Sequence, residues 1–278
     1  MPPLTLSSDE EILERIEKAL GEAAASVLSQ FIPGNVTAER KPSDGNLVTE
    51  ADRSLNRVLQ NFLLRDQEGW LSEESADDLT RRNKSRVWVV DPLDGTQEFI
   101  AGIPEWSISV AMVEHGKAIA GGVCNPATGE IFLGSRETGV TYNGYEAHAS
   151  KKDCLDGAVV LASRSEVERG EWAHFQRESF AIHPVGSVAY KLARVAAGLA
   201  DATWTLTPKN EWDVAAGAAL VEAAGGHMYF LPNLRPAFNN KVTLLPGLFA
   251  CGALLRDSIT SLLCPHVEAR SARWNDSK

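Results

Sequence analysis

The feature that most constrains the fold is a short β-branched run that leads directly into an acidic turn. Arg86-Val87-Trp88-Val89-Val90 is followed by Asp91-Pro92-Leu93-Asp94-Gly95-Thr96. The run predicts a buried strand, because β-branched and aromatic side chains pack well in a sheet. Open sheets tend to bind ligands at the carboxyl ends of their strands. The acidic turn is therefore the first candidate for a functional site.

The acidic turn offers several oxygen ligands close together. Asp91 and Asp94 stand three residues apart, in a turn that a proline makes rigid. Two like charges so placed repel each other unless a cation joins them, and the Leu93 carbonyl adds a third hard oxygen donor. Such donors favour magnesium, calcium or manganese, while Gly95 and Thr96 offer a backbone amide and a hydroxyl to a phosphate oxygen. The alternative is an acidic turn whose aspartates cap a helix.

The first half of the chain predicts two helices and an antiparallel meander. A capping-box start at Ser8 and apolar residues at helical spacing predict a helix over roughly residues 8–30. A second helix is expected from Thr49 or Glu50 to about Asp66. Its expected inner face comprises Leu55, Val58, Leu59 and Phe62. The expected strands of the meander are residues 106–113, 118–123 and 130–133. Turn-rich residues 139–144 are expected to connect two halves.

In the second half, short apolar runs alternate with helical patterns. A strand is expected at residues 159–161, and the expected helices are residues 165–179, 187–197 and 213–224. This alternation predicts a layered α/β fold. We expect residues 1–145 to form an N-terminal α+β half with the antiparallel sheet and the metal-site loop, and residues 146–265 a C-terminal α/β half. Residues 266–278 are expected to be a poorly ordered tail.

Composition narrows the possible partners. The formal net charge of −10 argues against a nucleic-acid polymer, whose backbone requires clustered Lys and Arg. A small anionic substrate stays compatible with it, because bound cations invert the local field. No signal-peptide pattern and no bilayer-long apolar run is present, so a soluble, cytoplasmic protein without membrane contact is expected. The widely spaced cysteines predict buried thiols rather than a zinc clip or a disulfide framework: Cys124, Cys154, Cys251 and Cys264.

Three further stretches share their order and approximate spacing with one enzyme family. They are Lys41 with Asn46-Leu47-Val48-Thr49-Glu50-Ala51-Asp52, then Leu71-Ser72-Glu73-Glu74-Ser75, and finally Glu211-Trp212-Asp213-Val214-Ala215-Ala216-Gly217 with Glu222-Ala223-Ala224-Gly225-Gly226. With the acidic turn they cover residues from about 40 to 250, and the chain resembles the inositol monophosphatase superfamily. The resemblance implies an α/β fold, namely the layered αβαβα sandwich of the inositol monophosphatase/fructose-bisphosphatase type.

The resemblance also implies a set of metal ligands. Two or three Mg²⁺ ions would be held by Glu73, Asp91, Asp94 and Asp213 through their side chains, by the Leu93 carbonyl and by Asp52. Lys41 and Thr49 would lie near the same cluster. Taken singly, Glu73 and Lys41 could equally be solvated surface charges, and Asp213 could be a helix N-cap.

The implied reaction is magnesium-dependent hydrolysis of a small phosphate monoester. Glu73 and Thr96 would orient and help deprotonate an attacking water, and Asp94 would help hold the magnesium that stabilises the leaving oxygen. Glu73, Thr96 and Asp94 are thus the expected catalytic residues. The resemblance further implies inhibition by lithium and a homodimer.

The substrate is only partly indicated. Gln97-Glu98-Phe99 after the acidic turn is more similar to the 3'(2'),5'-bisphosphate nucleotidase branch, although Gln97 departs from the usual residue of each branch. Inositol enzymes usually place a Glu several residues before the Trp-Asp pair, whereas here an uncharged segment precedes Lys209, a base that suits a second phosphate. The expected substrate contacts are Gly95, Thr96, Ser163, Arg164, Gly186, Ser187, Lys209 and Asp213.

The favoured prediction is a bisphosphate nucleotidase acting on 3'-phosphoadenosine 5'-phosphate. An inositol-1-monophosphatase or another sugar phosphate phosphatase is the alternative, because Lys209 and Arg164 could be solvated surface charges. A non-catalytic metal-binding scaffold is an alternative of another class. The presence of both Glu73 and Thr96 argues against the scaffold, since metal binding alone would not require a proton acceptor beside a hydroxyl.

Overall fold

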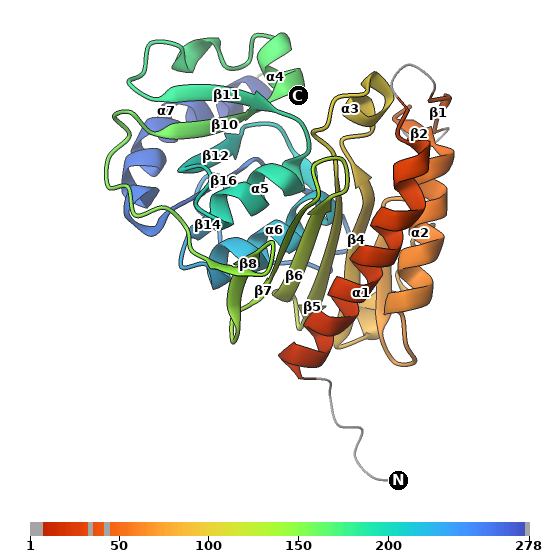
Figure 1. The fold of residues 1–278 in the computed structure, drawn as a ribbon. Helices are drawn as coiled ribbons and strands as arrows, with labels where there is room; N and C mark the ends of the chain where they lie inside the picture. Colours follow the sequence, from red (N-terminus) through yellow and green to blue (C-terminus); the bar gives the residue numbers. More distant parts are fainter. Residues whose placement is uncertain (1–7, 33–35, 42–44, 276–278) are drawn as a thin grey trace.

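Five layers of helices and sheets alternate in the computed structural model, which describes residues 8–32, 36–41 and 45–275, with residues 268–275 as backbone only. Helices α1 and α2 cover one face of a seven-stranded sheet, and α5 and α6 lie between that sheet and a five-stranded sheet (Figure 1). Helix α7 covers the outer face of the second sheet. These layers confirm the αβαβα sandwich that the sequence resemblance implies.

The first two layers comprise α1 (Asp9–Val27), α2 (Glu50–Leu63) and the larger sheet. In sheet order, its strands are β3 (Gly69–Ser72), β4 (Arg86–Asp94), β5 (Ser107–Glu114), β6 (Lys117–Asn125), β7 (Glu130–Ser135), β8 (Gly139–Tyr142) and β9 (Tyr145–Ala147). Strand β3 pairs with β4 in parallel, and the other pairs are antiparallel. A separate pair, β1 (Ala38–Arg40) and β2 (Leu47–Thr49), precedes α2. The short helix α3 (Thr96–Ala101) follows β4.

The remaining layers use the second half of the chain. The helices are α4 (Arg164–Glu168), α5 (Val188–Ala196), α6 (Glu211–Ala223) and α7 (Arg256–Asn275). In sheet order, the strands of the smaller sheet are β11 (Ala181–Val185), β10 (Val159–Ser163), β12 (Ala202–Thr205), β16 (Leu248–Cys251) and β14 (His227–Phe230). Strands β13 (Lys209–Asn210) and β15 (Leu244–Leu245) form a pair of their own.

Alternation along β4 explains how the layers are joined. Trp88 and Val90 point toward α1 and α2, where they are fully buried. Val87 and Val89 point the other way, into the core shared with α5 and α6. Both faces of this strand are therefore apolar, as a central strand between two helical layers requires. The same alternation places Asp91 on the α5 and α6 side of the sheet.

Several sequence expectations need correction. Phe62 of α2 is 39% exposed, with the Lys18 ammonium over its ring, because the inner stripe of the helix ends at Leu63 instead. Residues 139–144 are not a free connector, since they form β8 and the turn into β9. The polar helix expected over residues 165–179 ends at Glu168 and is followed by a one-turn 3₁₀ helix, Ala173–Phe175. Cys154 and Cys264 are exposed, whereas Cys124 and Cys251 are buried as expected.

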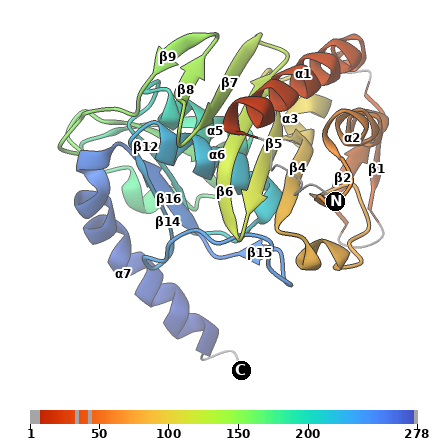
Figure 2. The ribbon, with the colours of Figure 1, turned by 90° about the horizontal axis from the view of Figure 1, so that it is seen from below.

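The expected tail is largely helical. Helix α7 continues through Pro265 to Asn275, and its last turns extend away from the body of the molecule (Figure 2). Ile259 and Leu263 are buried against the second sheet and anchor its first half. Pro265 is exposed, and the helix continues past it. Residues 276–278 lie outside the described part of the chain. Across the described residues, no helix is long and apolar enough to cross a membrane.

Candidate metal centre and active site

The parallel pair β3 and β4 brings two carboxylates together. Leu71 is opposite Val89 and Ser72 is opposite Val90, and the Glu73 amide donates to the Val90 carbonyl at 3.4 Å. The next residues along the two strands are Glu73 and Asp91. Because parallel strands end at the same edge of a sheet, both side chains reach that edge on the face toward α6.

Helix α6 supplies the third carboxylate at its first turn. Asn210 caps the helix, and its backbone amide donates to the Asp213 carboxylate at 2.8 Å. This capping box fixes the Asp213 side chain. One carboxylate oxygen each from Glu73, Asp91 and Asp213 lies within 4.8 Å of the others. Two strand ends and a helix start, from segments far apart in sequence, therefore converge on one point.

This cluster concentrates negative charge away from water. Burial raises the pKa of Asp91 well above its usual value, and the charges of Glu73, Asp94 and Asp213 raise it further. Burial, followed by repulsion from Asp94 and Glu73, likewise raises the pKa of Asp213. Burial raises the pKa of Glu73 to about 7, although attraction to Lys41 opposes the shift. Hard oxygen donors that repel one another fit a divalent cation such as Mg²⁺, which would relieve the repulsion.

Asp94 lies at the same edge but is held by a different helix. Its carboxylate accepts hydrogen bonds from the Ser187 hydroxyl at 2.7 Å and from the Ala189 amide at 2.6 Å, at the start of α5. The Ser187 hydroxyl also lies 2.9 Å from that of Ser107. Asp94 thus links the end of β4 to the N-terminus of α5, where the helix dipole favours a negative charge.

Asp52 and Thr49 lie behind the acidic turn. Asp52 is buried and accepts hydrogen bonds from the Thr49 amide at 2.7 Å and hydroxyl at 2.6 Å. Its other oxygen accepts from the Thr96 hydroxyl, which also donates to the Leu93 carbonyl, each at 3.2 Å. Asp52 is therefore not brought into the three-carboxylate cluster. In this arrangement it positions Thr96.

A cavity of about 290 Å³ opens over the carboxylates. Its lining includes the carboxyl end of β4 and the start of α3, which are adjacent in Figure 1. Most of the residues expected from the sequence line the cavity: Glu73, Asp91, Leu93, Asp94, Gly95, Thr96, Ser163, Gly186, Ser187, Lys209 and Asp213. Gly95 has a φ of +98°, and a side chain at Gly186 would come within 2.5 Å of the Glu105 carbonyl oxygen. Glycine is therefore required at both positions for the turn and for the close approach.

Besides Asp52 and Thr49, two further expected residues do not line this cavity. Arg164 forms an ion pair with Glu105 at 2.6 Å, and the same carboxylate accepts from the Gly186 amide at 2.8 Å. Arg164 thus braces the loop before α5. Lys41 contacts the cluster from outside, since its ammonium lies 2.8 Å from Glu73 and also pairs with Glu74. Burial acts to lower the pKa of Lys41, but attraction to Glu73 and Glu74 raises it above its usual value.

The cavity contains two lysines with different surroundings. Lys209 pairs with the buried Glu166 at 3.1 Å, and Glu166 also accepts from the Thr205 hydroxyl at 2.6 Å. Lys191 is buried and its ammonium donates to the Ser187 carbonyl at 2.6 Å. Burial lowers the pKa of Lys191 to about 8, against the attraction of Asp94.

Sequence reasoning missed part of the lining. The residues not expected as site residues are Asn46, Leu47, Gln97, Glu98, Ser165, Val188, Lys191, Asn210 and Trp212. For three of them a signal existed: Gln97 and Glu98 directly follow the acidic turn, and Lys191 lies one helical turn after Ser187. The others lie at or beside the ends of strands and helices, whose approach depends on the whole fold.

Comparison with known proteins gives a consistent result. A family model described as the inositol monophosphatase family matches residues 7–270. The inositol-1-monophosphatase of Rhizobium meliloti (strain 1021) is 35% identical over 226 residues, or 77% of this chain and 84% of that protein. The structure of the Thermotoga maritima IMPase matches with a TM-score of 0.79 at 27% identity, covering 92% of this chain and 99% of that one. CysQ from Bacteroides thetaiotaomicron, described as a bacterial member of the family, matches with a TM-score of 0.72 at 26% identity, covering 87% and 97%.

Proposed function

Since the chain belongs to the inositol monophosphatase family of phosphatases, we propose that it hydrolyses a bisphosphate nucleotide such as 3'-phosphoadenosine 5'-phosphate with Mg²⁺. The observation that carries the metal-dependent reaction is the convergence of Glu73, Asp91 and Asp213 within 4.8 Å. Two or three magnesium ions, lithium inhibition, a homodimer and a cytoplasmic location belong to the same proposal.

In the mechanism, the carboxylates of Glu73, Asp91, Asp94 and Asp213 and the Leu93 carbonyl would hold the cations. Magnesium held there would supply charge neutralisation for the phosphate oxygens and the leaving oxygen and would favour ionisation of a water molecule. Glu73, which also pairs with Lys41, would accept the proton from the attacking water. Thr96, fixed by Asp52, orients the water, and the amides that start α3 orient the phosphate.

The proposal of a nucleotide substrate is supported by a lysine in the cavity. An uncharged segment stands where the resemblance would place an acid in inositol enzymes, and Lys209, which follows it, could receive a second phosphate. The Glu166 carboxylate, 3.1 Å from the ammonium, offsets the positive charge of Lys209. That pairing, and the name of the R. meliloti relative, favour inositol 1-phosphate as the second candidate substrate.

Phosphate release tests the proposal. Purified protein would be supplied with 3'-phosphoadenosine 5'-phosphate, inositol 1-phosphate and fructose 1,6-bisphosphate, with and without Mg²⁺. We expect the highest kcat/KM with the nucleotide, and K209M should lower it by about tenfold or more while affecting inositol 1-phosphate little. Faster release from inositol 1-phosphate would select the second candidate. If none of the three releases phosphate with magnesium, the metal-binding scaffold is the hypothesis that remains.

A further inference from the structure

A second cavity lies at the opposite end of α6 from the carboxylate cluster. It encloses about 340 Å³, within the range of small-ligand pockets, and is lined by the start of β6, the end of α6 and the loop after β14. Ala218 and Glu222 of α6 face it, whereas Asp213 lies in the first turn of the same helix. Asp213 and Glu222 are nine positions apart, roughly 13 Å along the helix axis.

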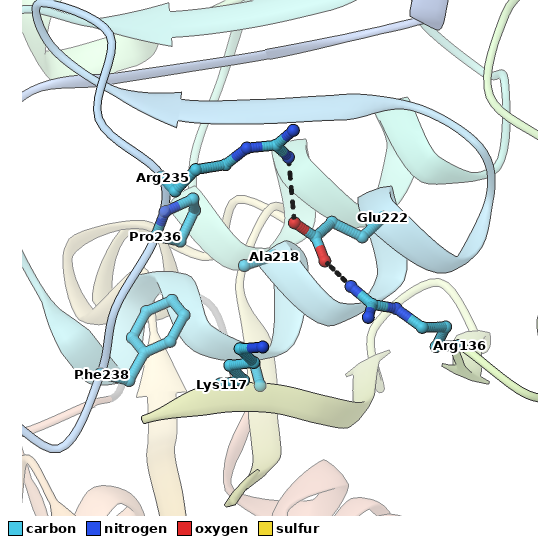
Figure 3. Close-up of a pocket in the computed structure, with 8 residues that line it drawn as sticks. Lys117, Arg136, Ala218, Glu222, Arg235, Pro236 and Phe238 are labelled. Carbon is cyan, nitrogen blue, oxygen red and sulfur yellow. Dashed lines mark hydrogen bonds and ion pairs between the residues drawn. The ribbon is translucent and has the colours of Figure 1, made fainter. Parts of the chain in front are cut away.

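The loop after β14 forms one wall of this cavity. Phe238 is buried, and its amide donates to the Gly116 carbonyl at 2.9 Å, which ties the loop to the turn between β5 and β6. Pro236 adds a second rigid apolar surface beside it (Figure 3). The wall is therefore fixed by packing and a backbone hydrogen bond.

The charged residues that line the cavity are mostly basic. The basic ones are Lys117, Arg136 and Arg235, and a single carboxylate, Glu222, lines the cavity with them. Figure 3 shows Glu222 between the two guanidinium groups, at 2.9 Å from Arg136 and 3.8 Å from Arg235. The lining thus has an excess of positive charge, although the whole chain carries a formal charge of −10.

The Tyr229 ring holds Arg235 in place, and Arg256 on the same ring extends the positive region. The Arg235 guanidinium lies 5.0 Å from the centre of the Tyr229 ring, and that of Arg256 lies 4.8 Å from it. Such stacking orients a guanidinium without neutralising it. Burial and then the charges of Arg256 and Arg235 lower the pKa of His227, in agreement with a local positive potential.

We propose that this cavity, between the end of α6 and the loop after β14, is a second ligand site for a small phosphorylated metabolite. Guanidinium groups bind phosphate oxygens through paired hydrogen bonds, and two of them with an ammonium group suit a ligand of at least two negative charges. Without the ligand, the Glu222 carboxylate occupies the position of one of the ligand's anionic groups. On binding, the ligand replaces Glu222 as the partner of Arg136 and Arg235. The apolar wall contacts the uncharged part of the ligand.

Inorganic pyrophosphate is the probe that tests this site. Binding is measured by calorimetry on the full chain, freed of metal and checked by its melting curve, with sodium chloride as the ionic-strength control. Without metal, the carboxylate cluster repels anions, so the heat of binding reports the second site. The variants are R136Q/R235Q, E222Q and the matched control R82Q/R177Q, whose arginines are exposed elsewhere on the surface.

We expect saturable binding that R136Q/R235Q weakens by about tenfold or more and that R82Q/R177Q leaves unchanged. Both cavity arginines are largely exposed, so their loss should not unfold the chain. E222Q removes the competing carboxylate and should tighten binding severalfold, a gain that misfolding does not produce. Absence of saturable binding to the parent protein, or equal affinity of the two double variants, overturns the proposal.

Discussion

Asp91 has a carboxylate in a place where burial and three neighbouring acids oppose its ionisation. A side chain so placed destabilises the folded chain until a cation neutralises it. Its only hydrogen bond in the turn comes from the Leu93 amide at 3.0 Å among the described contacts, which leaves its second oxygen for a metal. The site therefore has a stability cost that its function explains.

Substituting Asp91 by Asn tests whether this carboxylate lowers the stability of the metal-free protein and is required for activity. D91N removes a charge that the metal requires, so kcat for magnesium-dependent hydrolysis should fall by about a hundredfold or more. The same change removes repulsion among Glu73, Asp91 and Asp213, so the metal-free protein should melt at a higher temperature. Kinetic assays and melting curves on the same preparations measure both effects. A variant that is as active as the parent, or less stable without metal, contradicts the assignment.

Lys41 gives a second prediction for a single residue. Its ammonium opposes the rise in the pKa of Glu73, so K41M should raise that pKa further above 7. Protons compete with magnesium for Glu73. The pH below which magnesium affinity falls, here called the acidic limb, should therefore move up by about one unit. Magnesium titrations between pH 6 and 9 measure the limb, with K241M, at an exposed lysine, as the control. An unmoved limb would show that Lys41 does not influence Glu73.

At the scale of single residues, the sequence predicts the acidic turn but not the contacts of its side chains. The acidic turn follows from local chemistry, because Asp91, Asp94 and the Leu93 carbonyl lie within four residues. The partners of these groups do not follow from it. Asp94 is bound by the start of α5, and Asp52 turns to Thr96, through contacts that only the folded chain creates. Arg164 was expected at the substrate and instead pairs with Glu105.

Among the elements at the site, the loop that starts α5 has little room for a larger residue. A methyl group at Gly186 would come within 2.5 Å of the Glu105 carbonyl oxygen and of the Glu98 side chain. We expect G186A to displace the helix start that binds Asp94, lowering kcat/KM by at least about tenfold and stability by about 1–3 kcal/mol.

The matched control is G21A in α1, where a methyl group meets no atom within 4 Å. That change should stabilise the protein by about 0.5–1 kcal/mol and leave activity unchanged. Denaturant unfolding and initial rates measure both variants. Equal effects of the two substitutions would contradict the assigned role of the loop.

Elements with strong periodicity could be predicted from the sequence, and those determined by tertiary contacts could not. Helices α1, α2, α5 and α6 and the meander of β5, β6 and β7 lie close to their expected residues. The polar segment after β10 has only weak helical preference and folds as short turns over Trp172 and Phe175, which pack on Trp204. Helix α7 passes Pro265 because Ile259 and Leu263 fix its first half on the sheet.

At the scale of the whole molecule, the metal site connects stability to pH. The folded-state pKa of Glu73 is raised to about 7 from 4.5, and those of Asp91 and Asp213 are also raised. Groups with raised values stabilise the metal-free fold fully below their unfolded pKa, and this contribution is lost as pH rises through the folded value. The metal-free protein should therefore lose stability between about pH 5 and 8 through these groups.

Magnesium should reverse that loss, because it binds the ionised carboxylates of the folded state. We expect the rise in Tm on adding Mg²⁺ to be larger at pH 8 than at pH 6 by several degrees, since about 1 kcal/mol shifts Tm by roughly 2–4 °C in a protein of this size. Scanning calorimetry at both pH values measures the difference, with sodium chloride of equal ionic strength as the control. A larger rise at pH 6 would contradict the assignment of these pKa shifts.

The most direct test of the central claim is the magnesium dependence of phosphate release by the parent protein and by D213N. The account predicts no release from chelator-treated protein, saturable activation by Mg²⁺, and a D213N variant that needs much more magnesium and turns over at least about a hundredfold more slowly. Release by the metal-free parent at the magnesium-saturated rate, or parent-like activation of D213N, would contradict a reaction that depends on cations held by these carboxylates.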